Sequence, residues 1–237
     1  MQTHDRPTPA SAVHAGRGNR ALVIGASGGI GAALVAALRQ QGAEVTTLSR
    51  RDDGFDLTDP DSIAAALLGL DGPFDTVLVA TGLLAPQGRR PEKALSEIDA
   101  AAMAEMMAVN AIGPALILRA LPRLLPRSGP ARVGILTARV GSIGDNRLGG
   151  WYSYRAAKAA ANQIVHTAAI EIARKRPDTV VVALHPGTVE TGFTRAYPGH
   201  AKVAPDVAAA NLLGVLDGLG PADSGGFFDW AGAPVPW

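Results

Sequence analysis

From Arg20 onward, short apolar runs alternate with longer stretches that have the apolar spacing of helices. This alternation constrains the fold strongly, because parallel strands need long crossover connections and are buried on both faces when helices form those connections. The chain has 237 residues, of which 47% are hydrophobic and 18% charged, so it can bury one large core but has no room for a second domain. We therefore expect one α/β domain over residues 20–237, after a flexible tail at 1–19.

The positions of the expected elements follow from the apolar pattern and from the glycines and prolines that flank it. Pro114 and Pro122 are expected to bend a long helix, since proline has no N–H to donate. The fold class predicted from the element order is α/β: a single-domain Rossmann fold with a doubly wound, seven-stranded parallel sheet and helices on both faces. Strands are expected at 21–24, 44–49, 75–80, 132–137, 179–184 and 225–228, and helices at 29–41, 61–70, 99–125, 152–175 and 205–219.

Charge and residue types exclude several classes of function. The formal net charge is +1 and the body of the chain has no basic block, so we expect no nucleic-acid partner. The chain has no cysteine, and its five histidines lack the spacing of metal ligands, so we expect no metal site. Residues 1–19 have no apolar run typical of a signal peptide, and no window is apolar for long enough to span a bilayer. We expect a cytoplasmic protein that binds a small molecule and no membrane.

A glycine-rich loop follows the first expected strand and opens the first expected helix, in the stretch Gly25-Ala-Ser-Gly-Gly29-Ile-Gly31. This context predicts a phosphate-binding site, because the amide groups at a helix N-terminus attract anions. Gly25 can form the tight turn, Gly29 allows the backbone to approach a pyrophosphate, and Gly31 allows close packing of the helix on the strand. The alternative is a glycine-rich turn that only connects two elements.

The second expected strand ends at Ser49, followed by Arg50 and Arg51. In dinucleotide-binding folds an acidic residue near this position hydrogen-bonds the adenine ribose of NAD. A serine there removes the charge repulsion, and the two guanidinium groups can pair with a ribose 2′-phosphate. This pattern favours NADP over NAD as the cofactor, although two arginines after a strand can also form a solvated edge.

Tyr154 and Lys158 lie four residues apart in an alanine-rich helical stretch. This spacing places them on one face of the helix, where the ammonium group can stabilise the phenolate and lower the tyrosine pKa. Such a tyrosine can exchange a proton with a substrate during hydride transfer. Tyr152 is the competing acid, but at about 100° per residue it points roughly 120° away from Lys158, so we expect it to pack or line the pocket.

Further short motifs follow the expected strands and helices. With the two motifs already described, they form the series Gly25 to Gly31, Asp56-Leu57, Ala80-Thr81-Gly82, Asn110, Tyr154-x-x-x-Lys158 and Pro186-Gly-Thr-Val-Glu-Thr191. With this series the chain resembles the short-chain dehydrogenase/reductase superfamily from Arg20 to Trp237. Residues 139–154 and 224–237 resemble, more narrowly, the C-factor-like and sniffer-type carbonyl reductase branch.

The resemblance implies a role for each matching residue. Asp56 would hold the adenine amino group with Leu57 beside it, and Gly82 would let the chain pass close to the cofactor ribose. Val189 would donate its backbone N–H, and Thr191 its hydroxyl, to the nicotinamide carboxamide. Lys158 would bind the nicotinamide ribose, and Asn110 would anchor a water that resupplies protons. The alternative for Asn110 is to satisfy a helix distortion near Gly113-Pro114, and the two roles are compatible. The implied cofactor site also includes Ser27, Gly28, Ile30, Ala80, Thr81, Tyr154, Pro186 and Gly187.

The chain departs from the family at the serine that polarises the substrate carbonyl. That position falls on Ala138, with Thr137 before it and Ser142 four residues after. Losing one such donor costs about a hundredfold or more in turnover, so Ser142 or Thr137 replaces it, or the enzyme is slow on ordinary ketones. We expect Ser142 to be the replacement. Thr81 also stands where the family has an asparagine.

The expected activity is NADP-dependent hydride transfer between the nicotinamide and a carbonyl or secondary alcohol of a small or medium substrate. The alternative is a nicotinamide-binding redox-sensing or signalling protein with weak or no turnover. A loop at about 192–204, with Phe193, Tyr197 and His200, is expected to cover the substrate. The outer faces of the long helix and of the Tyr154 helix are apolar, so we expect a homodimer or homotetramer.

Overall fold

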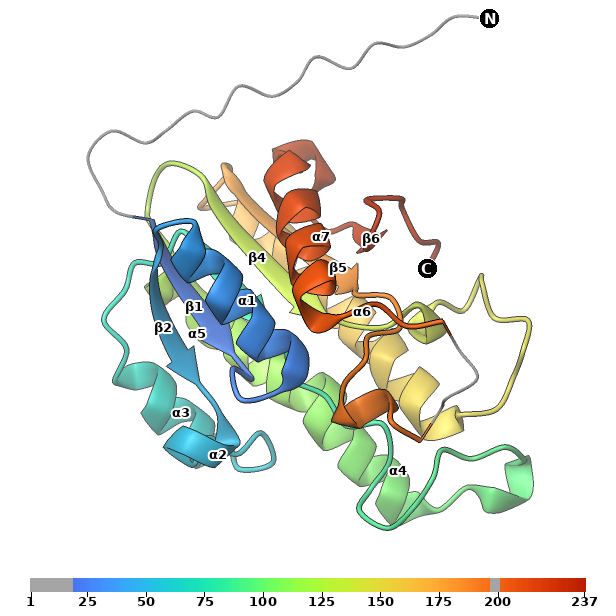
Figure 1. Ribbon diagram of the computed structural model, residues 1–237. Helices are drawn as coiled ribbons and strands as arrows, with labels where there is room; N and C mark the ends of the chain where they lie inside the picture. The colour runs from blue at the N-terminus through green and yellow to red at the C-terminus, as the bar shows by residue number, and fades with distance from the viewer. Residues whose placement is uncertain (1–18, 197–200) are drawn as a thin grey trace, which may run out of the picture.

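The computed structural model describes residues 19–196 and 201–237. Within them, six strands form one parallel sheet in the order β2-β1-β3-β4-β5-β6 (Figure 1). Residues 1–18 of the tail expected at 1–19 lie outside the described residues, as do Tyr197 and His200 of the expected substrate loop. The strands are β1 (Arg20–Ile24), β2 (Glu44–Leu48), β3 (Thr76–Val79), β4 (Ala131–Leu136), β5 (Thr179–His185) and β6 (Phe227–Asp229).

Helices cover both faces of the sheet, as the alternating pattern predicts. On one face, α1 (Gly29–Gln40) packs beside α7 (Pro205–Gly218), and both lie in front of the sheet in Figure 1. The other face carries α3 (Pro60–Leu68), α5 (Gly113–Leu124) and α6 (Tyr152–Ala173), while α4 (Ala100–Met107) packs against α6. A short helix, α2 (Arg50–Asp53), follows β2.

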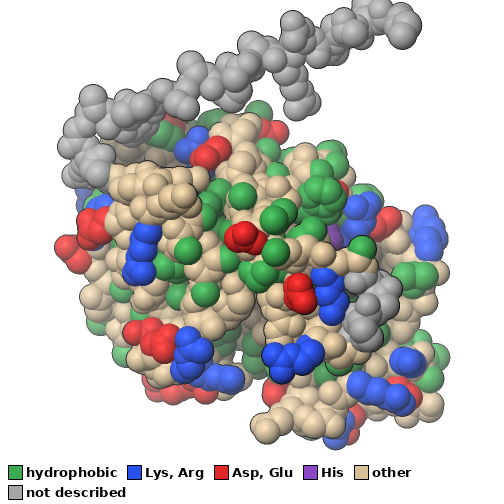
Figure 2. All heavy atoms as spheres, in the orientation of Figure 1, with side chains coloured by type: hydrophobic (Ala, Val, Ile, Leu, Met, Phe, Trp, Pro, Cys, Tyr) green, Lys and Arg blue, Asp and Glu red, His purple; other side chains and the backbone are tan. Residues whose placement is uncertain are grey.

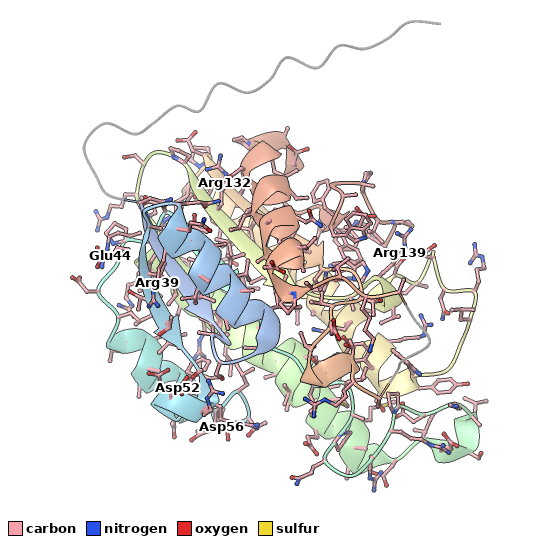
Figure 3. The ribbon with its side chains drawn as sticks, viewed as in Figure 1. Arg39, Glu44, Asp52, Asp56, Arg132 and Arg139 are labelled. Atoms are coloured by element: carbon pink, nitrogen blue, oxygen red, sulfur yellow. The ribbon has the colours of Figure 1, made fainter. Side chains whose placement is uncertain are left out.

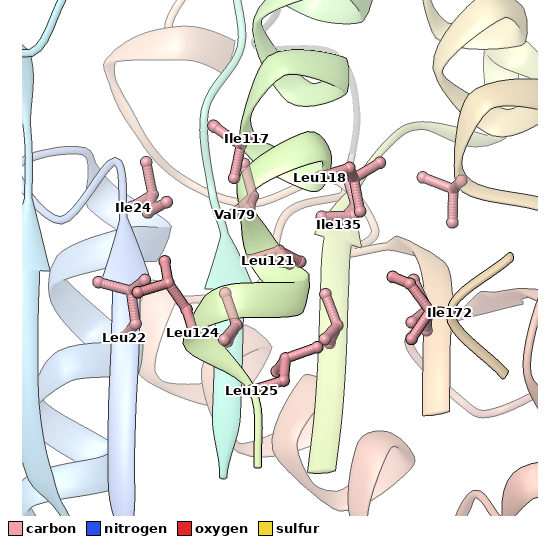
Figure 4. Close-up of a cluster of buried hydrophobic side chains, with 14 of the residues drawn as sticks. Leu22, Ile24, Val79, Ile117, Leu118, Leu121, Leu124, Leu125, Ile135 and Ile172 are labelled. Carbon is pink, nitrogen blue, oxygen red and sulfur yellow. The ribbon is translucent and has the colours of Figure 1, made fainter. Parts of the chain in front are cut away.

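Each face of the sheet has its own buried cluster of aliphatic side chains. Period-2 alternation along β1 directs Ala21 and Val23 toward α1 and α7, and Leu22 and Ile24 toward α5. Figure 4 shows how one side of α5 lies across β1, β3 and β4. The contacts in that view join Ile117, Leu118, Leu121 and Leu124 of α5 to Leu22, Ile24, Val79 and Ile135 of the strands.

The observed elements agree closely with those expected from the sequence. Every expected strand and helix is present, with its ends displaced by at most two residues. The sheet has six strands over the described residues rather than seven. The segment after β6 turns back along it and makes one isolated antiparallel bridge, between Phe228 and Pro234, and Pro234 and Pro236 have no N–H with which to extend that pairing.

The long helix is interrupted by a π-helical segment, η2 (Ala108–Ile112), between α4 and α5. Pro114 lies in the first turn of α5 and has no N–H to donate to the carbonyl oxygen of Asn110, four residues earlier. Residues Ala100–Leu124 are long and apolar enough to span a membrane by length and composition, contrary to expectation. In the fold, the inward face of this stretch is buried against the sheet, α3 and α6.

The strand order reverses beside β1, because β2 lies on one side of it and β3 on the other. In open parallel sheets a ligand binds at the carboxyl ends of the strands at such a reversal. Here the two loops touch: a Cβ atom on Gly25, whose φ is +89°, would lie 2.7 Å from the carbonyl oxygen of Ala80. The fold therefore brings the glycine loop and the loop after β3 together at the edge where the candidate site lies.

Candidate active site

A cavity of about 450 Å³ opens at the carboxyl ends of the strands. It joins the start of α1, the ends of β3, β4 and β5, and the first two turns of α6. Of the residues expected to bind the cofactor or to react, the cavity is lined by Ser27, Gly28, Gly29, Ile30, Ala80, Thr81, Gly82, Tyr154, Lys158, Pro186, Gly187, Val189 and Thr191. The topology therefore brings segments far apart in the sequence into one site.

The N-terminus of α1 is open to an anion. Its N-cap residue, Gly28, has no side chain to accept from the first helical amides, and the first turn contains no acidic residue. A Cβ atom on Gly31 would lie 2.1 Å from the carbonyl oxygen of Gly25, so only glycine allows the helix to pack on the turn. A Cβ on Gly29 would lie 2.5 Å from Cγ2 of Thr191, so this glycine also lets the loop after β5 approach. The amides of Gly25, Ala26 and Gly28 are bonded to backbone carbonyl oxygens, whereas the first amides of α1 have no capping side chain and can bind a pyrophosphate.

Tyr154 and Lys158 are both buried and lie on the side of α6 that faces the cavity. The Lys158 ammonium donates to the carbonyl oxygen of Leu136 at the end of β4 (3.1 Å) and lies 5.9 Å from the centre of the Tyr154 ring. A Cβ on Gly82 would be 3.5 Å from the Lys158 Nζ atom. A glycine at position 82 therefore leaves the space beside the ammonium group free for a ligand.

Burial dominates the protonation of this pair. It raises the pKa of the Tyr154 phenol above its usual value of 10.0, and it lowers the pKa of the Lys158 ammonium to about 8. The expectation that Lys158 lowers the tyrosine pKa is therefore corrected: desolvation of the phenolate outweighs the nearby cation. At neutral pH, Tyr154 holds its proton and can act as a proton donor.

Asn110 lies in the π-helical segment and does not line the cavity. Its side chain accepts from the backbone N–H of Leu83 (3.0 Å) and donates to the carbonyl oxygens of Leu83 (2.8 Å) and Met106 (3.1 Å). These bonds tie the distorted helix to the chain that follows Gly82. The Asn110 side chain thus bonds backbone groups at the helix distortion, which is the structural one of the two roles expected for it.

The structure does not bring Ser142 into the cavity. Its hydroxyl donates to the carbonyl oxygen of Pro236 (2.5 Å) and accepts from the backbone N–H of Asp145 (3.0 Å), so it anchors the C-terminal segment. Thr137 lines the cavity, but its Oγ1 atom is buried without a hydrogen-bond partner. Ala138 packs in the small apolar cluster that contains Tyr154, so the position beside the phenol carries a methyl group instead of a hydroxyl.

Two aspartates, Asp52 and Asp53, lie beside Ser49 at the end of β2. Ser49 is the N-cap of α2, and its hydroxyl donates to the carboxylate of Asp52 (2.9 Å), while its backbone N–H donates to Asp53 (2.8 Å). The Arg51 guanidinium is paired with Asp52 (3.1 Å), and Arg50 is exposed. Figure 3 shows Asp52 and Asp56 near the carboxyl end of β2, and Figure 2 shows acidic and basic side chains together at that edge. Carboxylates therefore lie next to Ser49, although the residue that ends the strand is itself not acidic.

Asp56 and Leu57, which the family resemblance assigns to the adenine, do not line the cavity. The Asp56 carboxylate accepts from the backbone N–H and the hydroxyl of Thr58, both at 2.8 Å, and these hydrogen bonds lower its pKa. Leu57 packs at the start of α5, where a Cβ on Gly113 would lie 3.0 Å from it. Both residues are thus held in fixed positions at the sheet edge.

The expected substrate loop is closed at its base by a bridge between Val189 and Val203. Within it, the short helix η4 (Gly192–Thr194) carries Phe193, whose ring centre lies 6.2 Å from that of Tyr154. The Phe193 side chain also approaches the position above Gly82. The described part of the loop therefore packs beside Tyr154, and its role in covering a substrate stays a prediction.

Sequence reasoning missed His185, which ends β5 and lines the cavity. Burial, followed by the positive charge of Arg139, lowers its pKa to about 4, so the imidazole is neutral at pH 7. Its Nδ1 atom is buried without a partner. The available signal was its position at the carboxyl end of a buried strand, next to Pro186-Gly187. Across residues 19–196 and 201–237, no group of three or more His, Cys, Asp or Glu side chains could hold a metal ion.

Comparison with known proteins agrees with this geometry. A family model described as enoyl-(acyl carrier protein) reductase matches residues 25–218. The chain is 32% identical over 232 residues to 1-hydroxy-2-glutathionyl-2-methyl-3-butene dehydrogenase of Rhodococcus sp. (strain AD45), an alignment that covers 91% of this chain and 98% of that protein. It is 40% identical over 145 residues to C-signal of Myxococcus xanthus, covering 61% of this chain and 84% of C-signal.

A solved structure of a putative short-chain dehydrogenase/reductase from Burkholderia multivorans with bound NADP superposes with a TM-score of 0.75. Its sequence is 26% identical, and the superposition covers 93% of this chain and 100% of that one. The similarity to C-signal agrees with the narrower resemblance to the C-factor-like branch. The family model, the full-length relative and the buried Tyr154–Lys158 pair beside the glycine loop lead to one conclusion. The chain belongs to the short-chain dehydrogenase/reductase family and is an oxidoreductase.

Proposed function

We propose that the protein reduces a carbonyl group of a small or medium substrate with NADPH. The observation that carries this proposal is the buried, protonated Tyr154 beside Lys158, in the same cavity as the open N-terminus of α1. The nicotinamide would supply a hydride to the carbonyl carbon. Tyr154 would give its proton to the developing alkoxide, and Lys158 would stabilise the phenolate that remains. At neutral pH the phenol is protonated, which is the form that reduction requires, because the developing alkoxide must receive a proton.

The remaining positions of the site are assigned on the same basis. The amides of the glycine loop would bind the pyrophosphate, and Val189 and Thr191 would hold the carboxamide beneath the loop that carries Phe193. Asp56 and Leu57 would contact the adenine, as the family pattern implies. Asn110 ties the π-helical segment to Leu83 through its side chain. Its backbone carbonyl oxygen cannot accept from Pro114, which has no N–H. This oxygen would hold a water near Lys158.

The proposed cofactor is NADP, with Arg50 as the partner of the 2′-phosphate. Two observations support this assignment: Arg50 is exposed beside the end of β2, and the similar Burkholderia protein has NADP bound. Arg51 contributes less, because Asp52 already pairs with it. The carboxylates of Asp52 and Asp53 oppose a bound phosphate, so the preference for NADPH over NADH is expected to be moderate.

The site is proposed to act with Tyr154 as its single side-chain donor to the substrate carbonyl. The hydroxyl hydrogen of Ser142 is committed to Pro236, and the Oγ1 atom of Thr137 is enclosed. Thr137 follows Ile135 by two residues, so its side chain points to the face of the sheet that α6 covers. The consequence is a slow reaction with ordinary ketones, the third of the outcomes expected for a chain with alanine at position 138.

A homodimer or homotetramer formed through the outer faces of α5 and α6 remains part of the proposal, as does a cytoplasmic location. Ile112, just before α5, and Ile170 of α6 are each 50% exposed, which supports an apolar interface on these faces. No observation in the described parts of the chain favours the alternative of a redox-sensing protein without turnover.

Replacing Tyr154 with phenylalanine should lower kcat for carbonyl reduction by about 10²-fold to 10⁴-fold, because the proton donor is removed while the ring remains. NADPH consumption with a panel of aldehydes and ketones measures this effect. Tyr152→Phe is the matched control and should change kcat by about twofold at most. Unchanged turnover in Tyr154→Phe would refute the proposed mechanism.

The reduction rate should fall at alkaline pH. The Lys158 ammonium, with its pKa lowered to about 8, loses its proton as the pH rises through this value, and the phenolate then loses its stabilising charge. At saturating NADPH and substrate, kcat should be nearly constant between pH 6 and 7 and reach about half by pH 8. Lys158→Met should be slow and lack this decline, whereas Lys175→Met, on an exposed part of the chain just after α6, should retain it. A rate that rises from pH 7 to 9 contradicts the assignment.

The Arg50→Ala variant should bind NADPH about tenfold more weakly and leave the affinity for NADH nearly unchanged, since only NADPH carries the 2′-phosphate. Arg51→Ala should have a smaller effect on NADPH. Fluorescence titration of each cofactor measures both affinities. Equal loss for NADH and NADPH, or no loss for either, rules out Arg50 as the phosphate partner.

Introducing the missing hydroxyl should accelerate the reaction. Ala138→Ser places a donor beside Tyr154 and should raise kcat on simple ketones by about tenfold to a hundredfold. Ser142→Ala and Thr137→Val should each stay within about threefold of the parent, because neither hydroxyl serves the substrate. If Thr137→Val instead lowers kcat at least tenfold, Thr137 is the second donor and the assignment is overturned.

A further inference from the structure

The catalytic helix begins without a capping side chain of its own. α6 starts at Tyr152, and its N-cap residue, Trp151, has a left-handed backbone with φ of 55° after two glycines of positive φ. The indole of Trp151 can only donate a hydrogen bond, so it cannot accept from the first amides of the helix. Such amides need an acceptor when they are buried. The acceptor must come from another part of the chain.

Glu92, which lies 61 residues away in the sequence, supplies that acceptor. One carboxylate oxygen accepts from the backbone N–H of Ser153 (3.3 Å), and the other accepts from the Ser153 hydroxyl. The main-chain oxygen of Glu92 also accepts from the N–H of Trp151 (2.5 Å). Ser153 immediately precedes Tyr154, so these bonds fix the turn that carries the proton donor.

The side chain of Glu92 is buried: the residue is 8% exposed. A carboxylate in such a place loses much of its hydration, which is costly unless hydrogen bonds and a favourable field replace it. Here the hydrogen bonds come from Ser153, and the partial positive charge at the N-terminus of α6 provides the field. An exposed polar residue on a loop would have no such constraint, so the burial indicates a specific task.

The segment that bears Glu92 also forms the wall next to the catalytic tyrosine. This segment starts at Gly82 in the first cavity. Its residues Leu84 and Glu92 line a second cavity of about 530 Å³, together with Met106 of α4 and Ser153 of α6. Met106 packs in the same apolar cluster as Tyr154. Glu92 therefore joins this wall to the start of the catalytic helix.

We propose that Glu92 is a positioning residue: by capping α6 from the segment between β3 and α4, it holds the Tyr154 hydroxyl at the place where it reaches the substrate oxygen. The inference rests on the proposed function of Tyr154 as the proton donor. A displacement of about 1 Å in a catalytic group can cost about a hundredfold in rate, so a cap one residue from the donor has a direct kinetic effect.

The test compares Glu92→Ala and Glu92→Gln with Glu105→Ala, a control on an exposed position of α4. Glu92→Ala should lower kcat about tenfold to a hundredfold and change the Kd for NADPH by less than about twofold. Glu92→Gln keeps one acceptor oxygen and should restore part of kcat. It also keeps the assay informative if the alanine variant folds poorly.

The deciding measurement repeats Glu92→Ala in the Tyr154→Phe background. If Glu92 acts through the phenol, the substitution should change the residual rate by less than about twofold there, because no hydroxyl remains to be displaced. Losses that multiply in the double variant, or an unchanged kcat in Glu92→Ala alone, would overturn the proposal. A residue with only a structural role would give multiplied losses.

Hydrogen exchange separates this proposal from the proposed function. In Glu92→Ala, the amides of residues 153–156 should exchange about tenfold faster, while the C-terminal half of α6 stays unchanged. Unchanged exchange at 153–156 overturns the capping role even if the enzyme is active. Faster exchange in a protein that reduces no carbonyl in the panel supports the cap and counts against the proposed function.

Discussion

The contact between α6 and the end of β4 fixes the pair of residues to which the proposed chemistry is assigned. A Cβ atom on Gly141 would come within 2.8 Å of the carbonyl carbon and Cβ of Lys158, so the short helix after β4 packs directly on the backbone of α6. The Lys158 ammonium bonds the carbonyl oxygen of Leu136 in the same region. This close approach fixes Tyr154 and Lys158 relative to the strand ends, where the glycine loop and the loop after β5 also meet.

That packing has an electrostatic consequence. The same burial that orients the pair raises the pKa of Tyr154 and lowers that of Lys158, because each charged form loses its hydration. In the proposed reaction the neutral phenol gives the proton, and the Lys158 ammonium, which titrates near pH 8, stabilises the phenolate only while it is charged. The Glu92 carboxylate bonds the start of the same helix. The position of α6 therefore depends on two contacts, one with Glu92 and one with the end of β4.

The positions of the elements could be predicted well because they depend on local patterns. Apolar runs, glycines and prolines located each expected strand and helix within two residues, although the short helix α2 was not expected. The glycine loop, Tyr154, Lys158 and the Pro186 to Thr191 stretch all lie at the cavity at the strand ends. The prediction for the end of β2 was less successful. Asp52 and Asp53 reach Ser49 because a helical turn, α2, forms at 50–53, where no helix was expected.

The amino-acid sequence by itself determined the fold class, the family and the residues able to donate a proton or bind phosphate, since these depend on residue type and spacing. The tertiary structure decided which of those groups are available. Ser142 is committed to Pro236, His185 lines the cavity, and Glu92 caps a helix 61 residues further along. Hydrogen-bond partners and burial arise from contacts between segments that are distant in the sequence. The spacing of residues along the chain does not reveal these contacts.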